Sequence, residues 1–117
     1  MHQDQALAAL SALANATRLE LVRTLVAAGP EGLAASDIAG RLGISASRLS
    51  FHLAALEQAG LVTARRAARN IFYAASARGL GGVISYLLDD CCAAHPEVCA
   101  CCTPRGAAGA VTPRPEP

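Results

Sequence analysis

The sequence predicts a mainly α-helical domain that carries one small β-hairpin, and two observations support this fold class. Apolar residues recur at intervals of three and four in five separate segments, which is the spacing of amphipathic helices. Between the fourth and fifth of these segments, two short runs with β-branched and aromatic residues flank a two-residue turn. The chain has 117 residues, 53% of them hydrophobic, so we expect one folded domain.

The first two helices are expected from Asp4 to Ala14 and from an Asn15 N-cap to about Ala28. Gly29-Pro30 ends the second helix, and residues 31–35 are expected to be a short connection. Helical spacing assigns one face of the first helix to Leu7, Leu10 and Leu13 or Ala14. It assigns that of the second helix to Leu19, Val22 and Val26, flanked by Leu21 and Leu25.

The third and fourth helices are predicted to form a helix-turn-helix. Ser36 caps or opens the third helix, which ends at Gly43, and Ser45 caps the fourth, which runs to Gly60. The buried face of the fourth helix is expected to comprise Leu49, Leu53 and Leu56. Two helices joined by a short glycine-containing turn are typical of this motif.

A hairpin and a fifth helix complete the predicted fold. Strands are expected over residues 61–67 and 70–75, with Ala68-Arg69 at the tip. Ser76 caps a last helix from about Ala77 to Asp90, whose apolar stripe comprises Leu80, Val83, Ile84, Leu87 and Leu88. These elements together predict a winged helix-turn-helix of about five helices and a two-stranded wing.

Positive charge is concentrated in the middle of the chain, although the whole chain carries a net charge of only +1. Six arginines and one acid lie between Ile38 and Tyr86, a balance expected of a surface that binds phosphates. His52 is expected to be packed and hydrogen-bonded and not to contact bases. The candidates for DNA contact lie in the fourth helix and its cap (Ser45, Ser47, Arg48, Ser50 and Phe51) and in the hairpin (Arg65, Arg66 and Arg69).

All five cysteines lie towards the C-terminus, at Cys91, Cys92, Cys99, Cys101 and Cys102. No apolar run reaches the ~18 residues needed to cross a bilayer, and no secretory signal is evident, so we expect a cytoplasmic protein that does not bind a membrane. Thiols stay reduced in the cytoplasm, so the cysteines are expected to be ligands or reactive groups and not structural disulfides. Thiolates select soft metal ions.

Four segments carry a family resemblance: residues 13–19 (LANATRL), 37–45 (DIAGRLGIS), 49–56 (LSFHLAAL) and 59–62 (AGLV). Through them, the chain from about Ala6 to Cys99 resembles the ArsR/SmtB family of metal-sensing repressors. The resemblance implies five helices and a β-wing, a homodimer formed through the first and last helices, and double-stranded operator DNA that is released when an inducer binds.

The resemblance also implies where the inducer binds. Some arsenic sensors of the family carry a Cys-x-Cys pair in the third helix, but residues 33–38 (LAASDI) contain no cysteine. The chain is similar instead to a branch whose arsenite site is a Cys-Cys pair followed by a third cysteine, which Cys91, Cys92 and Cys99 match. Arsenic(III) is thus the implied inducer, with antimony(III) or methylarsenite as alternatives and no organic cofactor. Cys101, Cys102 and His95 are candidate accessory ligands.

Three other interpretations of the cysteines stay open. Cys91, Cys92, His95 and Cys99 are four acceptable zinc ligands. Paired thiols could form a redox switch, or the segment could be a cysteine-rich tail without a role. A non-regulatory arsenic-binding protein is a further alternative. An enzyme is not expected, because the sequence has no phosphate-binding glycine loop and no Cys/His pair of the catalytic kind.

The predicted organisation has three parts. Residues 1–92 form the DNA-binding and dimerisation domain, residues 93–102 the cysteine-rich inducer-binding segment, and residues 103–117 a disordered tail rich in Pro, Gly and Ala.

Overall fold

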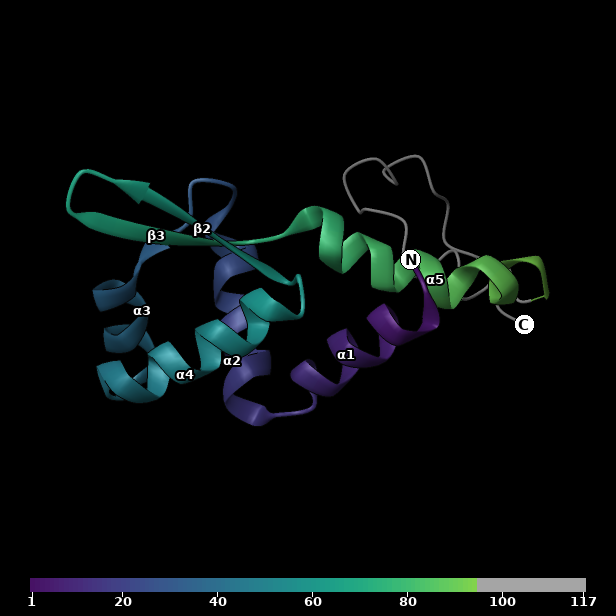
Figure 1. Ribbon diagram of the computed structural model, residues 1–117, viewed down its shortest axis with the longest axis horizontal. Coiled ribbons are helices and arrows are strands. Elements are labelled where there is room, and N and C mark those ends of the chain that lie inside the picture. The colour runs from purple at the N-terminus through teal and green to yellow at the C-terminus, as the bar shows by residue number, and fades with distance from the viewer. Residues whose placement is uncertain (95–117) are drawn as a thin grey trace, which may run out of the picture. The chain divides into compact units, whose positions relative to one another are not determined.

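The computed structural model describes residues 1–94, and the side chains of residues 1–88. Its elements are α1 (Gln3–Leu13), α2 (Ala16–Ala28), β1 (Leu33–Ala34), α3 (Ala35–Leu42), α4 (Ala46–Gln58), β2 (Val62–Ala67), β3 (Asn70–Ala75) and α5 (Ala77–Ala94) (Figure 1). The mainly helical winged helix-turn-helix is confirmed. The chain divides into two compact units after Ile84, and the packing described below is that of the first unit.

The sheet has three antiparallel strands in the order β1-β3-β2, one more than expected. Leu33 pairs with Tyr73 and Ala34 with Phe72, so the segment predicted as a plain connection contributes an edge strand. Gly32 makes this approach possible, because it has a φ of +79° and a Cβ there would overlap the Tyr73 carbonyl. Two residues are too few to show the alternating pattern that identifies a strand.

Three predicted helix caps are confirmed by hydrogen bonds. The Asn15 Oδ1 accepts from the Arg18 backbone N–H at 3.0 Å, and the Ser45 Oγ accepts from that of Arg48 at 3.2 Å. The Ser76 Oγ accepts from the Gly79 N–H at 3.0 Å. The third helix differs from the prediction, because α3 begins at Ala35 after an Ala34 N-cap that offers no side-chain bond.

The buried face of α1 is made of alanines, so the predicted face is wrong for Leu7 and Leu10, whereas Leu13 is partly buried and packs against the core as predicted. Ala6, Ala9 and Ala12 are buried, whereas Leu7 is 54% and Leu10 39% exposed. Small side chains allow α1 to lie close to α2 and α4, and Ala9 and Ala12 join the main core. Leu7 and Leu10 are left on the outer side of the helix.

The buried face of α2 is rotated relative to the prediction. Leu21, Val22 and Leu25 are buried in the core, while Leu19 is 50% and Val26 56% exposed. Two adjacent apolar stripes of this helix both have helical spacing, and spacing alone does not distinguish them. Among the described helices, none is both long and apolar enough to cross a membrane.

Candidate nucleic-acid interface

The helix α4 presents a buried apolar side and an exposed polar side, as the sequence predicts for a recognition helix. Leu49, Leu53 and Leu56 are each at most 2% exposed and fix the helix against the core. The opposite side exposes Phe51, at 66%, together with Ser47, Arg48 and Ser50. The exposed face thus carries hydroxyl donors, one guanidinium and one aromatic ring, which suit phosphates and base edges.

The turn between α3 and α4 follows from three residues. Gly43 has a left-handed φ of +67° and its N–H donates to the Ala39 carbonyl at 2.8 Å, which ends α3. Ile44 is half-buried against the core, and Ser45 caps the next helix. The Ser45 hydroxyl, which is exposed, accepts the cap bond from the Arg48 N–H. It also lies 3.4 Å from the Ser47 Oγ, within hydrogen-bond distance.

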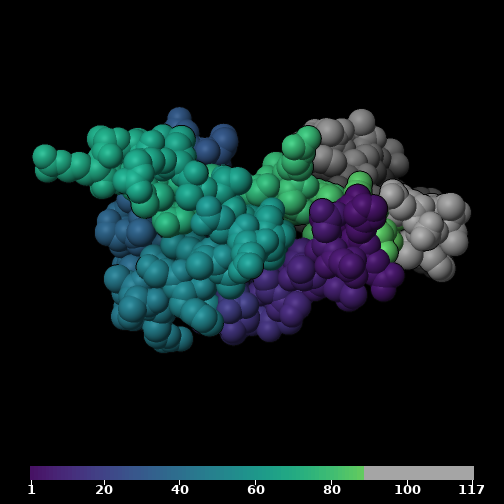
Figure 2. Space-filling view, viewed as in Figure 1, coloured from purple at the N-terminus to yellow at the C-terminus, as the bar shows by residue number. Residues whose placement is uncertain are grey.

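The β2–β3 hairpin forms the wing, which protrudes from the surface in the space-filling view (Figure 2). Its register pairs Arg66 with Ile71 and Ala67 with Asn70, so the tip is Ala68-Arg69, as predicted. The arginines Arg66 and Arg69 are exposed near this tip. They are therefore available to phosphates.

Arg65 differs from the other two arginines of the wing, because its side chain contacts other residues of the chain. Its Nη2 donates to the Glu31 carbonyl at 3.0 Å, and its guanidinium carbon lies 5.0 Å from the centre of the Phe72 ring on the neighbouring strand. Arg65 thereby joins the wing to the loop that follows α2. Arg65 is nevertheless exposed, and its predicted contact with DNA stays a prediction.

His52 is packed and hydrogen-bonded, as expected. It is 7% exposed, and its Nδ1 accepts a hydrogen bond from the Arg18 Nε at 3.1 Å. Burial, and then the positive charges of Arg18 and Arg48, lower the pKa of His52 below its ordinary value of 6.5. Sequence reasoning assigned no role to Arg18, since its partner is 34 residues away and no local pattern connects them.

The candidate metal ligands lie at or beyond the limit of the described residues. Cys91 and Cys92 belong to α5, which continues to Ala94, so the predicted helix end near Asp90 is wrong. Successive residues of a helix point about 100° apart. Cys99, Cys101, Cys102 and His95 lie outside the described residues. Within the part that is described, no three His, Cys, Asp or Glu side chains gather as a metal site.

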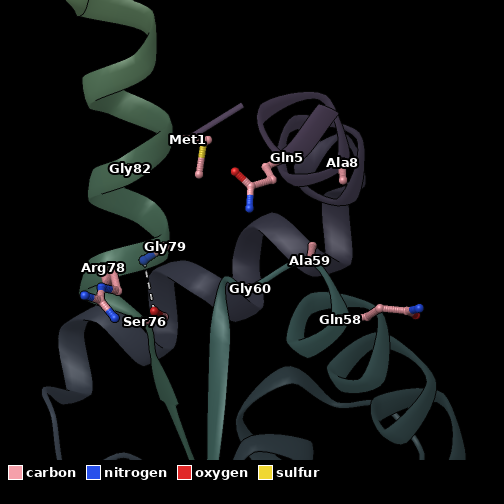
Figure 3. A pocket seen from close by; sticks show the side chains of 10 residues that line it. All are labelled: Met1, Gln5, Ala8, Gln58, Ala59, Gly60, Ser76, Arg78, Gly79 and Gly82. Atoms are coloured by element: carbon pink, nitrogen blue, oxygen red, sulfur yellow. Dashed lines mark hydrogen bonds between the residues drawn. The ribbon is translucent and has the colours of Figure 1, made fainter. Parts of the chain in front are cut away.

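A surface cavity of about 580 Å³ lies where the start of α1, the end of α4 and the first turns of α5 meet (Figure 3). Polar side chains around it include Gln5, Gln58 and Arg78, and the Ser76–Gly79 cap bond lies at its edge. Gly79 packs against the Gly60 carbonyl so closely that a Cβ would overlap that oxygen. Among the described residues that line the cavity there is no cysteine, and the only one from α4 is Gln58, at the end of the helix.

Comparison with known proteins also indicates a helix-turn-helix regulator. A family model described as a helix-turn-helix domain matches residues 13–65. The nodulation protein NolR of Rhizobium meliloti is 38% identical over 90 residues, covering 75% of this chain and 71% of that protein. A Halobacterium salinarum protein named for an arsenical resistance operon, ArsR, is 41% identical over 70 residues, 60% of this chain and 54% of that protein.

Among solved structures, a homodimeric winged helix-turn-helix DNA-binding domain from Mycobacterium bovis aligns with a TM-score of 0.60 and 30% identity, covering 79% of this chain and 85% of that one. The exposed face of α4, the exposed arginines of the wing and these relatives all indicate a DNA-binding regulator. The chain belongs to the ArsR/SmtB family of winged helix-turn-helix transcriptional regulators.

Proposed function

We propose that the protein is an arsenic(III)-responsive repressor that binds operator DNA as a homodimer and releases it when Cys91, Cys92 and Cys99 bind the inducer. The observation that carries the DNA-binding part is that α4 exposes a face with Ser47, Arg48, Ser50 and Phe51, while the wing exposes Arg66 and Arg69. In this proposal α4 lies in the major groove, where Arg48 meets a guanine or a phosphate and Phe51 a thymine methyl group. Arg66 and Arg69 contact the DNA backbone.

The homodimer is proposed from apolar side chains that the single chain leaves exposed. On α1 these are Leu7 and Leu10, and on α5 they are Ile84 and Leu87, each 46% exposed. A second copy that covers such side chains gains the free energy of burying them. The Mycobacterium bovis relative is homodimeric. A dimer also presents two copies of α4, as operators with two half-sites require.

The inducer site is proposed from the cysteines and their position along α5. Cys91 follows Ile84 and Leu87 at helical spacing, so it continues the line of exposed side chains proposed for the dimer contact. Three thiolates suit a soft trivalent ion, and the Halobacterium salinarum relative is named for arsenical resistance. Inducer binding at the end of this helix would favour a dimer geometry in which the two α4 helices no longer match the operator.

A titration of the DNA complex with arsenite tests both parts. The full chain is mixed with labelled DNA from upstream of its own gene, and binding is followed by fluorescence anisotropy at fixed salt. We expect tight binding and full release by arsenite, while zinc at the same free concentration and a mild oxidant leave the complex intact. Failure to bind any such fragment at low salt would refute the repressor.

Cysteine variants separate the sensing part from DNA binding. Cys91→Ser, Cys92→Ser and Cys99→Ser should bind DNA like the parent protein and lose the arsenite response. Cys101→Ser and Cys102→Ser are the matched controls and should keep it. A normal response in all three triad variants would eliminate this site, and a zinc response lost with His95→Ala would favour the zinc interpretation.

A further inference from the structure

Arg18 lies on α2, outside the helix-turn-helix and the wing, yet its side chain reaches the recognition helix. Its Nε donates to the His52 Nδ1 at 3.1 Å, and its guanidinium carbon lies 5.6 Å from the centre of the Phe51 ring. The Phe51 and His52 rings meet edge to face, with centroids 5.5 Å apart and planes at 68°. Arg18, His52 and Phe51 thus form one contiguous group, here called the Arg18 cluster.

The buried histidine fixes the direction of the arginine. Because the Nδ1 of His52 accepts the bond, that nitrogen carries no proton and the ring is neutral with its proton on Nε2. His52 is held in the core, so the Arg18 Nε–H is directed at a stationary acceptor. The planar guanidinium is thereby oriented, with Phe51 beside it.

Phe51 is the member of the Arg18 cluster whose ring is least restricted by packing. It is 66% exposed, so core packing restricts its ring only weakly. An exposed ring that contacts a base must be ordered when DNA binds, and ordering a free side chain costs conformational entropy. A ring already held between a guanidinium and an imidazole avoids part of that cost.

We propose that Arg18 is a positioning residue for DNA recognition, which holds the Phe51 ring on the exposed face of α4 through its contacts with His52 and Phe51. The proposal rests on the recognition role of α4 given above. Arg18 acts through Phe51 and needs no base contact of its own.

The first test uses the protein without DNA, so it is independent of the proposed function. The chain contains only two phenylalanines, Phe51 and Phe72, and each lies beside one arginine. In protein labelled with fluorophenylalanine, we expect two ¹⁹F resonances, assigned with Phe51→Leu. Arg18→Lys should shift and broaden the Phe51 resonance alone, and the matched Arg65→Lys should shift the Phe72 resonance alone. If the Phe51 resonance keeps its chemical shift and linewidth in Arg18→Lys, the proposal is refuted.

The second test measures coupling between the two residues in operator binding. We expect Arg18→Ala to weaken operator binding about threefold to tenfold in the parent protein, and by less than about twofold in a Phe51→Ala background. Arg23→Ala removes an equal charge from the same helix and should have the same effect in both backgrounds. If Arg18→Ala does not fold, Arg18→Lys replaces it in the cycle. Equal losses for the Arg18 variant in both backgrounds would show a direct phosphate contact and refute the positioning role.

Discussion

His52 is a buried histidine on a helix whose other side faces solvent. It stays neutral because charging it would place a cation in the core beside Arg18 and Arg48, and would remove the acceptor of the Arg18 bond. No acidic side chain is bonded to His52 among the described residues to offset that charge. His52 is therefore the residue from which we expect a dependence of stability on pH.

We predict that stability falls as the pH decreases below 6.5. An unfolded His52 takes up a proton near its ordinary pKa of 6.5, whereas the lowered pKa keeps folded His52 neutral to lower pH. Between these two values the unfolded chain binds more protons, so the contribution of neutral His52 is complete above pH 6.5 and is lost as the pH falls to the folded pKa. Thermal unfolding between pH 7.5 and 5.5 measures this loss.

The comparison for this prediction is between two histidine variants. His52→Gln should show a flatter pH profile than the parent protein in this range, while His2→Gln, which changes an exposed histidine at the start of α1, should keep the parent slope. Equal slopes for the parent protein and His52→Gln would contradict the assignment.

At the scale of elements, the first turn of α5 is fixed by a glycine pair. Gly79 lies against the carbonyl of Gly60, which itself has a φ of +81°. Gly81, on the same helix, has no atom near the position of a Cβ. A methyl group added at Gly79 would therefore overlap backbone atoms, whereas one added at Gly81 would not.

We predict opposite effects of alanine at these two sites. Gly79→Ala should lower the free energy of unfolding by more than about 1 kcal/mol, because the added methyl group overlaps a backbone oxygen. Gly81→Ala should raise it by about 0.5–1 kcal/mol through helix propensity. Urea unfolding of both variants measures the two free energies. A Gly79→Ala variant more stable than the parent protein would contradict the close contact between Gly79 and the Gly60 carbonyl.

The wing should make two distinct contributions to DNA binding. Arg66→Ala or Arg69→Ala should weaken binding similarly on all sequences and reduce the slope of log K against log salt by about 1, because each removes one phosphate contact. Arg65→Ala should instead disturb the hairpin, since its guanidinium bonds to Glu31. The salt series is measured on operator and unrelated DNA, and unchanged slopes in Arg66→Ala and Arg69→Ala would exclude the wing from the interface.

How far the sequence predicts each element depends on its local signals. For α4, a cap, a leucine stripe and a terminating glycine all agree, and both its bounds and its exposed face were predicted. For α1, the leucines dominated the pattern, yet close packing against neighbouring helices favoured alanines, which is a tertiary effect. For the same reason β1, which depends on the approach of Gly32 to Tyr73, and Arg18, which depends on His52, could not be predicted locally.

At the scale of the whole molecule, we predict that association depends on α5. Ile84→Glu or Leu87→Glu should yield monomers with weakened operator binding, because a charge would have to be buried in the proposed contact. Leu19→Glu changes a comparably exposed leucine, 50% against 46%, and should remain dimeric. Sedimentation equilibrium measures the mass, and an intact dimer of Ile84→Glu would remove this part of α5 from the contact.

The order of the strands has a consequence for how two copies can meet. Because β3 is central, the sheet ends in β1, which is two residues long, and in β2, whose exposed stretch includes Arg65 and Arg66. A very short edge and a doubly charged edge both resist pairing with the backbone of another chain. Growth of the sheet from one molecule to the next is therefore disfavoured, and open-ended filaments of this domain should not compete with a closed pair.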